Sequence, residues 1–248
     1  MSVFSDLKQK IDNKGAAYIV LIDPDKKNQE LISQFVNEGN KSNVDAFFVG
    51  GSLMMDSKSS SRVKRIKQKS NIPLILFPGG VGQLNKHFDA MLFMSVISGR
   101  NSHYLIGEQV IAAPIVKDLR LETISTGYIL VDGGACSTVE FMSGTRPIPL
   151  NRIDIIIAHA LAGQYLGMDW IYLESGSGAE TPISSEVVSA VSESIDIPII
   201  VGGGIKSPEK ASELVNAGAS IIVTGKITEE ESKLMSEIAK AVHWKKHD

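Results

Sequence analysis

Eight short apolar runs rich in β-branched residues recur along the chain, and this pattern limits its possible folds more than any other feature. Strands buried on both faces, as in parallel sheets, are nearly continuous apolar runs, whereas half-exposed strands alternate. The predicted strands are Ala17–Pro24, Asp45–Ser52, Ile72–Gly79, Ala90–Ile97, Gly127–Gly134, Asp169–Gly176, Ile197–Gly204 and Ser220–Lys226. Amphipathic segments of helical length separate most of them, so the sequence predicts a (β/α)8 TIM barrel.

Two segments depart from a regular barrel. The link GVGQLNKHFD, Gly80–Asp89, is too short for the usual crossover helix between the third and fourth strands. We therefore predict that the third helix is missing or replaced by an extended piece. Val3–Asn13 precedes the first strand and predicts an extra N-terminal helix that closes the bottom of the barrel. No low-complexity linker or charge block divides the chain, so residues 1–248 are predicted to form a single domain.

Composition argues against several classes of protein. A formal net charge of −3 over 248 residues gives no polybasic character for nucleic-acid or membrane-surface binding. The single cysteine, Cys136, cannot form an intrachain disulfide, which suits a reducing compartment. The N-terminus lacks the apolar core of a signal peptide, and the longest uncharged stretch, Ile155–Met168, is too short to span a bilayer. We therefore expect a cytoplasmic protein that meets any lipid from the water side.

Glycines gather where the predicted strands end, which is the rim that carries the active site in (β/α)8 barrels. Gly202–Ile205 runs straight into a helix opened by Ser207 and Pro208, where free N–H groups and the helix dipole favour an anion. We predict a phosphate site at strands seven and eight; tight turns without a ligand are the alternative. The stretch GSGAET lacks the third glycine of a dinucleotide fingerprint, so we do not predict a nucleotide cofactor.

Two acids end predicted strands. Glu174 closes the apolar run before SGSGA, where partial burial would raise its pKa toward that of a general base; a structural salt bridge is the alternative. Asp23, within IDPDK, is placed to bind Mg²⁺ or, equally well on residues alone, to cap the following helix. The five histidines lack metal-ligand spacing, and we interpret the basic stretch Lys64–Lys69 as a solvated helix face.

Taken together, several motifs resemble those of the geranylgeranylglyceryl phosphate synthase family, which includes bacterial heptaprenylglyceryl phosphate synthases. These motifs are IDPDK, VGGS, LFPGG, the PIP of Pro147–Pro149, YLESGSGA, VGGGIKSPE and VTGK. The resemblance covers nearly the whole chain. The length of the chain and its VGGGI motif resemble those of the larger of the two groups in the family, which is found in archaea and some bacteria. The resemblance implies a modified barrel that lacks the third helix. It also implies that the protein forms dimers or hexamers.

The resemblance also implies a reaction and its residues. The reaction is Mg²⁺-dependent transfer of a polyprenyl group from its diphosphate to sn-glycerol 1-phosphate, in which we expect Glu174 to act as the general base. Asp23 and Ser52 match the magnesium positions. The glycerol phosphate positions are matched by Tyr172, Leu173, Glu174, Ser175, Gly176, Ser177, Gly178, Gly203, Gly204, Gly225 and Lys226. Lys226 stands where the family usually has asparagine, and its backbone amide remains able to bind phosphate.

Other interpretations remain open. A phosphate-binding barrel isomerase or lyase shares the glycines of strands seven and eight and would use a second acid such as Asp132. A non-catalytic phosphate sensor would bind without forming product. The prenyl tail requires an apolar trough, for which the candidates, each equally explicable as core, are Phe77, Phe93, Met94, Tyr104 and Ile106.

Overall fold

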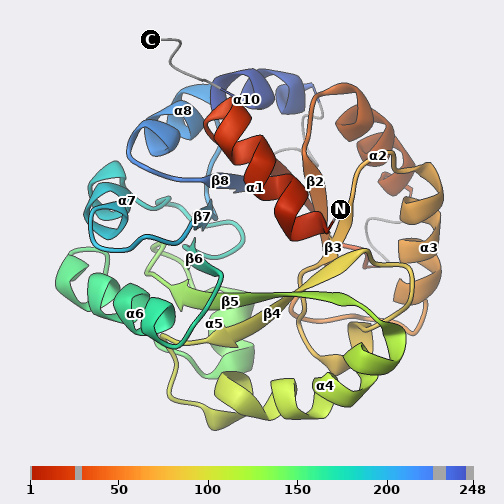
Figure 1. The fold of residues 1–248 in the computed structure, drawn as a ribbon, viewed down its shortest axis with the longest axis horizontal. Coiled ribbons are helices and arrows are strands. Elements are labelled where there is room, and N and C mark those ends of the chain that lie inside the picture. The colour runs from red at the N-terminus through yellow and green to blue at the C-terminus, as the bar shows by residue number, and fades with distance from the viewer. Residues whose placement is uncertain (1, 26–29, 226–232, 244–248) are drawn as a thin grey trace.

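Eight parallel strands close into a barrel, as the sequence predicts (Figure 1). The computed structural model describes residues 2–25, 30–225 and 233–243. Each strand pairs with its neighbours in sequence, and β8 pairs with β1. The strands are β1 (Ala17–Ile22), β2 (Ala46–Val49), β3 (Leu74–Leu76), β4 (Ala90–Val96), β5 (Glu122–Leu130), β6 (Trp170–Glu174), β7 (Ile199–Gly202) and β8 (Ile221–Thr224).

Helices surround this barrel (Figure 1). They are α1 (Val3–Lys14), α2 (Ile32–Lys41), α3 (Ser59–Lys69), α4 (Glu108–Leu119), α5 (Thr138–Ser143), α6 (Ile153–Tyr165), α7 (Ser185–Ser192), α8 (Pro208–Asn216) and α10 (Leu234–Val242). Between β3 and β4 the chain forms a single 3-10 turn, η2 (Val81–Gln83). This confirms that the third barrel helix is missing. None of the described helices is long and apolar enough to cross a membrane.

Some element boundaries differ from those predicted. β5 begins at Glu122 rather than Gly127, because the polar residues before Gly127 still pair with β4. The amphipathic segment between β4 and β5, residues 102–120, is divided into a π-helical turn, η3 (His103–Gly107), and α4. The short helix α5 was not predicted. Part of the last amphipathic segment, residues 228–246, lies outside the described residues.

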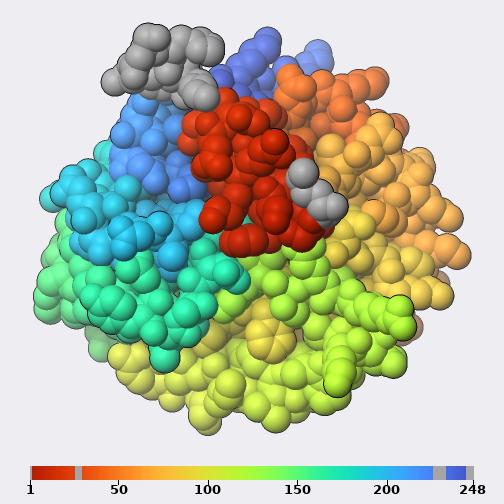
Figure 2. Space-filling model, viewed as in Figure 1, coloured from red at the N-terminus to blue at the C-terminus, as the bar shows by residue number. Residues whose placement is uncertain are grey.

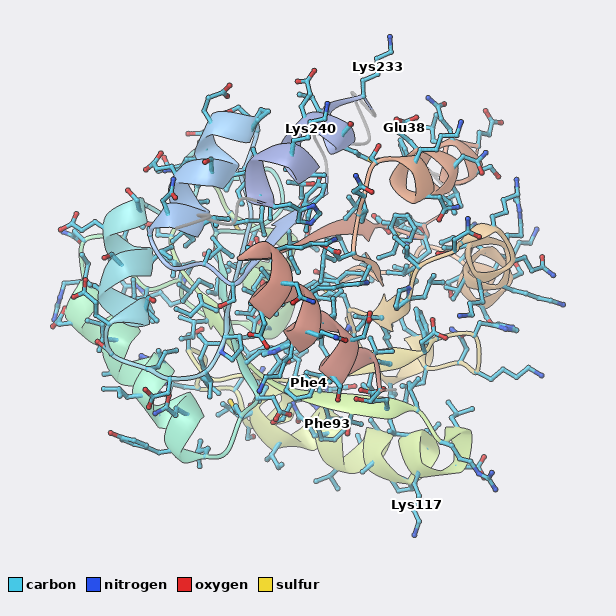
Figure 3. The ribbon with its side chains drawn as sticks, turned by 45° about the horizontal axis from the view of Figure 1, so that its top comes forward. Phe4, Glu38, Phe93, Lys117, Lys233 and Lys240 are labelled. Atoms are coloured by element: carbon cyan, nitrogen blue, oxygen red, sulfur yellow. The ribbon has the colours of Figure 1, made fainter. Side chains whose placement is uncertain are left out.

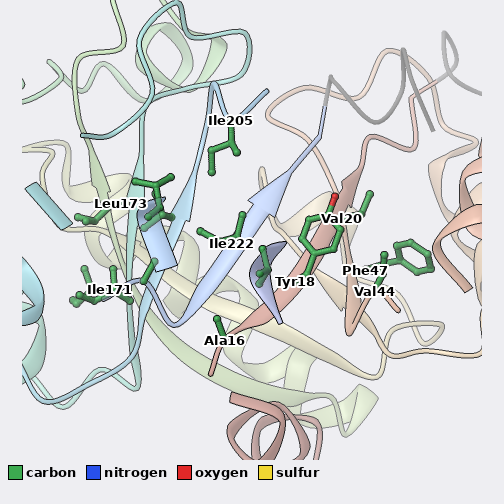
Figure 4. Packing of buried hydrophobic residues seen from close by; sticks show 14 of the residues in the cluster. Ala16, Tyr18, Val20, Val44, Phe47, Ile171, Leu173, Ile205 and Ile222 are labelled. Carbon is green, nitrogen blue, oxygen red and sulfur yellow. The ribbon is translucent and has the colours of Figure 1, made fainter. Parts of the chain in front are cut away.

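Strand side chains alternate between two apolar layers, as strand geometry requires. Tyr18, Val20 and Phe47 lie in the outer layer, between the strands and the helices (Figure 4). The inner layer fills the barrel and includes the rings of Phe77, Tyr128 and Tyr172, whose centroids are 5.5–6.3 Å apart. This inner aromatic layer occupies the middle of the barrel, so the polar chemistry is confined to the ends of the strands.

A side-chain acceptor immediately precedes each even-numbered strand and accepts a backbone N–H from the strand before it. The four bonds are Tyr18 N to Asp45 Oδ2 (2.9 Å), Leu74 N to Asp89 Oδ2 (2.8 Å), Ser125 N to Asp169 Oδ2 (3.0 Å) and Ile199 N to Ser220 Oγ (3.3 Å). Each bond satisfies a backbone donor beside the start of the following, even-numbered strand. The acceptors therefore join β1 to β2, β3 to β4, β5 to β6 and β7 to β8 at the bottom of the barrel.

Helix α1 lies across the N-terminal end of the barrel and covers it, as predicted (Figures 1 and 2). The Glu122 carboxylate accepts the N–H groups of Val3 (2.8 Å) and Phe4 (2.9 Å), which places a negative charge at the positive end of the α1 dipole. Phe4, at this end of α1 (Figure 3), packs on Trp170 with ring centroids 5.6 Å apart. This end of the barrel is therefore sealed, which leaves the opposite mouth for substrates.

Candidate active site

Glu174 ends β6 at the C-terminal mouth of the barrel and is 7% exposed. Strand alternation puts it on the same side as Trp170 and Tyr172 of the inner layer, so its carboxylate faces into the barrel mouth. Its Oε1 accepts the N–H of Gly176 at 2.7 Å. No lysine or arginine in the described part of the chain forms an ion pair with it. The geometry of the described residues therefore gives no support to the alternative that Glu174 serves in a structural salt bridge.

The protonation of Glu174 is set mainly by its burial. Burial raises the pKa of Glu174 to about 7. The N–H of Gly176 and the hydroxyl of Tyr172 lower this pKa, but by less than burial raises it. Burial, together with the nearby charge of Glu174, raises the pKa of Tyr172, so that phenol stays protonated. The Tyr172 hydroxyl lies beside the carboxylate but reaches hydrogen-bond geometry with no described residue. A carboxylate with a pKa near neutrality is suited to accept a proton from a substrate hydroxyl.

Two glycines at the end of β7 make room for this carboxylate. A Cβ at Gly203 would lie 2.4 Å from Glu174 Oε1, and one at Gly202 would lie 2.8 Å from Oε2. Gly203 and Gly204 also have φ angles of +85° and +69°, which favour glycine. The sequence placed Gly202 in the predicted phosphate-binding turn, but did not show that Gly202 also leaves room for the Glu174 carboxylate.

The turns after β6 and β7 meet beside Glu174. A Cβ at Gly203 would lie 2.9 Å from the backbone nitrogens of both Ser175 and Gly176. Gly176 and Gly178 have positive φ angles, whereas Ser175 is buried and its hydroxyl has no partner among the described residues. The structure thus brings the predicted segment Tyr172–Gly178 against Gly203, and Gly204 against Ala179, which follows that segment.

This cluster offers backbone donors to an anion. The N–H groups of Gly203 and Gly204 donate to no acceptor among the residues that the structure describes. Helix α8 begins four residues after Gly204, and Ser207 caps it by accepting the N–H of Lys210 at 3.2 Å. Free amides and the positive end of α8 together suit the predicted phosphate site. Gly225 directly follows β8, and Lys226 lies outside the described residues.

Asp23 follows β1 at the same mouth, and Gly51 and Ser52 follow β2. A Cβ at Gly51 would lie 3.2 Å from Asp23 Oδ1, so the Asp23 carboxylate lies beside the backbone that carries Ser52. The carboxylate also accepts the N–H of Asp25 at 3.1 Å. In the described part of the chain no three His, Cys, Asp or Glu side chains form a metal cluster. Mg²⁺ commonly uses one or two carboxylates with substrate phosphates, so this donor set fits it.

An apolar groove of about 500 Å³, open to solvent, lies between the β3–β4 connection and α4, where the third helix is missing. Phe93, Met94 and Tyr104, three of the candidates for lining an apolar trough, lie in the wall of this groove. Phe77 lies in the inner layer of the barrel, and Ile106 is 60% exposed. Sequence reasoning missed Glu108 and Gln109, the polar residues of the groove wall, because nothing local distinguishes them from other helix residues.

Asp132, the acid that a rival isomerase or lyase would use, follows β5 and is exposed. Its carboxylate accepts the N–H of Gly134 at 2.9 Å, which is the pattern of an Asx turn. Cys136 is also exposed. The local geometry therefore explains Asp132 as a turn residue.

The closed barrel, with a near-neutral acid at its glycine-rich mouth, is typical of barrel enzymes that act on phosphorylated substrates. The model of the PcrB family matches residues 8–242. The geranylgeranylglyceryl phosphate synthase of Chitinophaga pinensis is 46% identical over 94% of each chain, and that of Pyrococcus horikoshii is 42% identical over 92% of this chain and 89% of its own. The chain belongs to the PcrB family, and it is an enzyme of the prenyltransferase class.

Solved structures agree with this assignment. The (S)-3-O-geranylgeranylglyceryl phosphate synthase of Thermoplasma acidophilum, in complex with its substrate sn-glycerol-1-phosphate, is 33% identical and superposes with a TM-score of 0.92 over 98% of this chain and 99% of its own. The corresponding enzyme of Thermoplasma volcanium gives a TM-score of 0.89 at 33% identity, over 98% of this chain and 96% of its own. The fold of this chain is therefore that of these synthases.

Proposed function

We propose that this enzyme transfers a polyprenyl group, geranylgeranyl in particular, from its diphosphate to the C3 hydroxyl of sn-glycerol 1-phosphate. The products are an ether-linked lipid precursor and diphosphate. The family and the names of its relatives support this reaction. One observation of the structure carries it furthest: Glu174, with a pKa of about 7, lies against the glycine turn that offers free backbone N–H groups.

The phosphate of the acceptor binds at Gly203, Gly204 and the start of α8, and this holds the rest of the glycerol beside Glu174. Glu174 removes the proton of the C3 hydroxyl as its oxygen attacks the first carbon of the prenyl group. The carbon–oxygen bond to diphosphate breaks, and the diphosphate leaves with the bonding electrons. Binding the phosphate in a fixed position lowers the entropic cost of bringing the hydroxyl to the prenyl carbon.

Asp23 and Ser52, which follow β1 and β2, would hold Mg²⁺ at this mouth. When bound, the ion neutralises charge on the diphosphate and so makes it a better leaving group. The position of the Asp23 carboxylate beside Gly51 supports a shared site for the two loops. Lys226 is proposed to complete the glycerol phosphate site through its backbone amide.

The prenyl tail occupies the apolar groove between the β3–β4 connection and α4. Its apolar lining, which includes Phe93, Met94 and Tyr104, supports this. The groove exists because the β3–β4 connection contains a 3-10 turn in place of a helix. The irregularity of the barrel therefore provides the space for the lipid chain.

A substrate series tests the function directly. The purified protein is incubated with prenyl diphosphates of graded length and with each enantiomer of glycerol phosphate, and products are identified by mass. We expect a prenylglyceryl phosphate with the sn-1 enantiomer and Mg²⁺. Binding of glycerol phosphate without product would favour a sensor, and consumption of a sugar phosphate instead would favour an isomerase or lyase.

We further propose that the enzyme is a cytoplasmic homo-oligomer, either a dimer or a hexamer. Apolar side chains lie exposed on η3 and α4: Ile106, Val110, Ile111 and Ile115 are 42–64% exposed. A contiguous apolar helix face is typical of a protein interface. Sedimentation velocity over a range of concentrations tests this proposal, and a monomer at every concentration would contradict it.

A further inference from the structure

A buried arginine joins the two loops that carry the proposed metal residues. Arg62 belongs to α3, yet it is only 2% exposed. Its Nη1 donates to the backbone carbonyl of Pro24, next to Asp23, at 3.0 Å, and to Asp56 Oδ1 at 2.9 Å. Its Nη2 pairs with the second oxygen of Asp56. Arg62 therefore fixes the β1 loop to the segment that follows Ser52.

A second contact joins the same loops. Asp25 is buried, and its Oδ1 accepts the N–H of Met55 at 3.1 Å. The N–H of Asp25 donates in turn to Asp23 Oδ1. A continuous set of bonds thus runs from Arg62 through the backbone of Pro24 and Asp25 to the Asp23 carboxylate. A shift of either loop would move that carboxylate relative to Ser52.

Stability alone does not explain a buried arginine at this position. Burying an ion pair commonly costs as much as the pair returns, and apolar replacements of similar volume are often neutral or better. Arg62 Nε, moreover, has no hydrogen-bond partner in the described part of the chain. What the guanidinium provides and an apolar side chain cannot is a rigid fork that bonds a carbonyl and a carboxylate simultaneously.

We propose that Arg62 is a positioning residue for the metal–diphosphate site, acting through Pro24 and Asp56 to hold Asp23 and Ser52 at the spacing that the ion requires. This inference rests on the proposed function. Arg62 is buried and reaches the proposed site only through the residues that it bonds. Its charge also lies near those of Asp23 and Asp25, which it partly offsets before the ion binds. Residues behind metal ligands commonly change metal affinity about 10–100-fold when they are replaced.

The test uses Arg62→Lys, which keeps the charge and loses the fork. Calorimetric titration of the full-length protein with Mg²⁺ and inorganic diphosphate is expected to show binding at least about 10-fold weaker than in the wild type. Binding of sn-glycerol 1-phosphate, measured in the same way, is expected to be unchanged, because its site lies at β6 and β7. Asp56→Asn removes the other half of the pair and is expected to act in the same direction.

Arg152→Lys is the matched control, because Arg152, the exposed residue before α6, makes the same type of two-point bond to Asp154 in the first turn of that helix. Equal diphosphate affinity in wild type, control and a folded Arg62→Lys or Asp56→Asn variant would overturn the inference alone. Equal weakening of both ligands would also overturn it, since that indicates a general structural role. Failure of the wild type to bind diphosphate in a Mg²⁺-dependent way would overturn the metal site and this inference with it.

Discussion

Glu174→Gln is expected to lower kcat at least ~100-fold, which is the usual effect of removing a general base. Glutamine keeps the size of the side chain, and its carbonyl can still accept the N–H of Gly176, so the turn that binds phosphate is preserved. Binding of sn-glycerol 1-phosphate should therefore remain within about 3-fold of the wild type. Steady-state kinetics and a binding titration on the same preparation provide the two measurements. Near-normal turnover in the variant would remove Glu174 from the chemistry.

The pH dependence gives an independent check on the same residue. Because burial raises the pKa of Glu174 to about 7, kcat/KM of the wild type is expected to rise with pH and to level off above that value. The residual activity of Glu174→Gln should lack this rising limb. A wild-type profile that is already level at pH 5 would show that another group sets the protonation step.

The raised pKa of Glu174 also affects stability. Whereas activity is expected to rise with pH, stability is expected to fall. The folded-state pKa of Glu174 lies above that of an unfolded glutamate, so its contribution to stability is full below about pH 4.5 and is lost as the pH rises through about 7. At pH 8, Glu174→Gln should therefore be more stable to unfolding than the wild type, by about 1–3 kcal/mol. Thermal unfolding at pH 5 and pH 8 tests this, because the gain should shrink at the lower pH.

Asp23→Ala is expected to have the second large effect, a loss of about 100-fold or more in kcat/KM for the prenyl diphosphate. The reason is that the carboxylate proposed to hold Mg²⁺ against the diphosphate is lost, and excess Mg²⁺ should restore activity only in part. Initial rates across a Mg²⁺ series at fixed prenyl diphosphate measure both quantities.

Asp132→Ala is the control for this experiment, because Asp132 also follows a barrel strand but is exposed, and among the described residues its carboxylate bonds only within its own turn. It should keep the Mg²⁺ dependence of the wild type. If Asp23→Ala also kept it, the metal would have to be assigned to another part of the mouth.

The sequence predicted the barrel because its strands are buried on both faces and therefore appear as continuous apolar runs. It also predicted the missing third helix, since the length of Gly80–Asp89 leaves no room for one. Glu174 was singled out because it ends such a run next to small residues, and the structure brings it against Gly203. These features depend on local sequence, which is why one chain was enough to find them.

Features that depend on tertiary contacts were not predicted. The polar start of β5 pairs with β4 and is a strand only for that reason. Arg62 stands beside the basic stretch interpreted as solvated, but it lies four residues before the buried Ile66, on the same inward face of α3. Its partners, Pro24 and Asp56, approach it only in the folded protein.

Asp45, the acceptor before β2, also bears on where a tag or fusion partner can be attached to the protein. Besides the N–H of Tyr18, it binds Lys14 of α1 and His243, the residue after α10, each at 2.6 Å. One carboxylate thus fastens the first and last described helices to the sealed end of the barrel. Affinity tags or fusion partners attached at either terminus should accordingly leave substrate entry and product exit unobstructed.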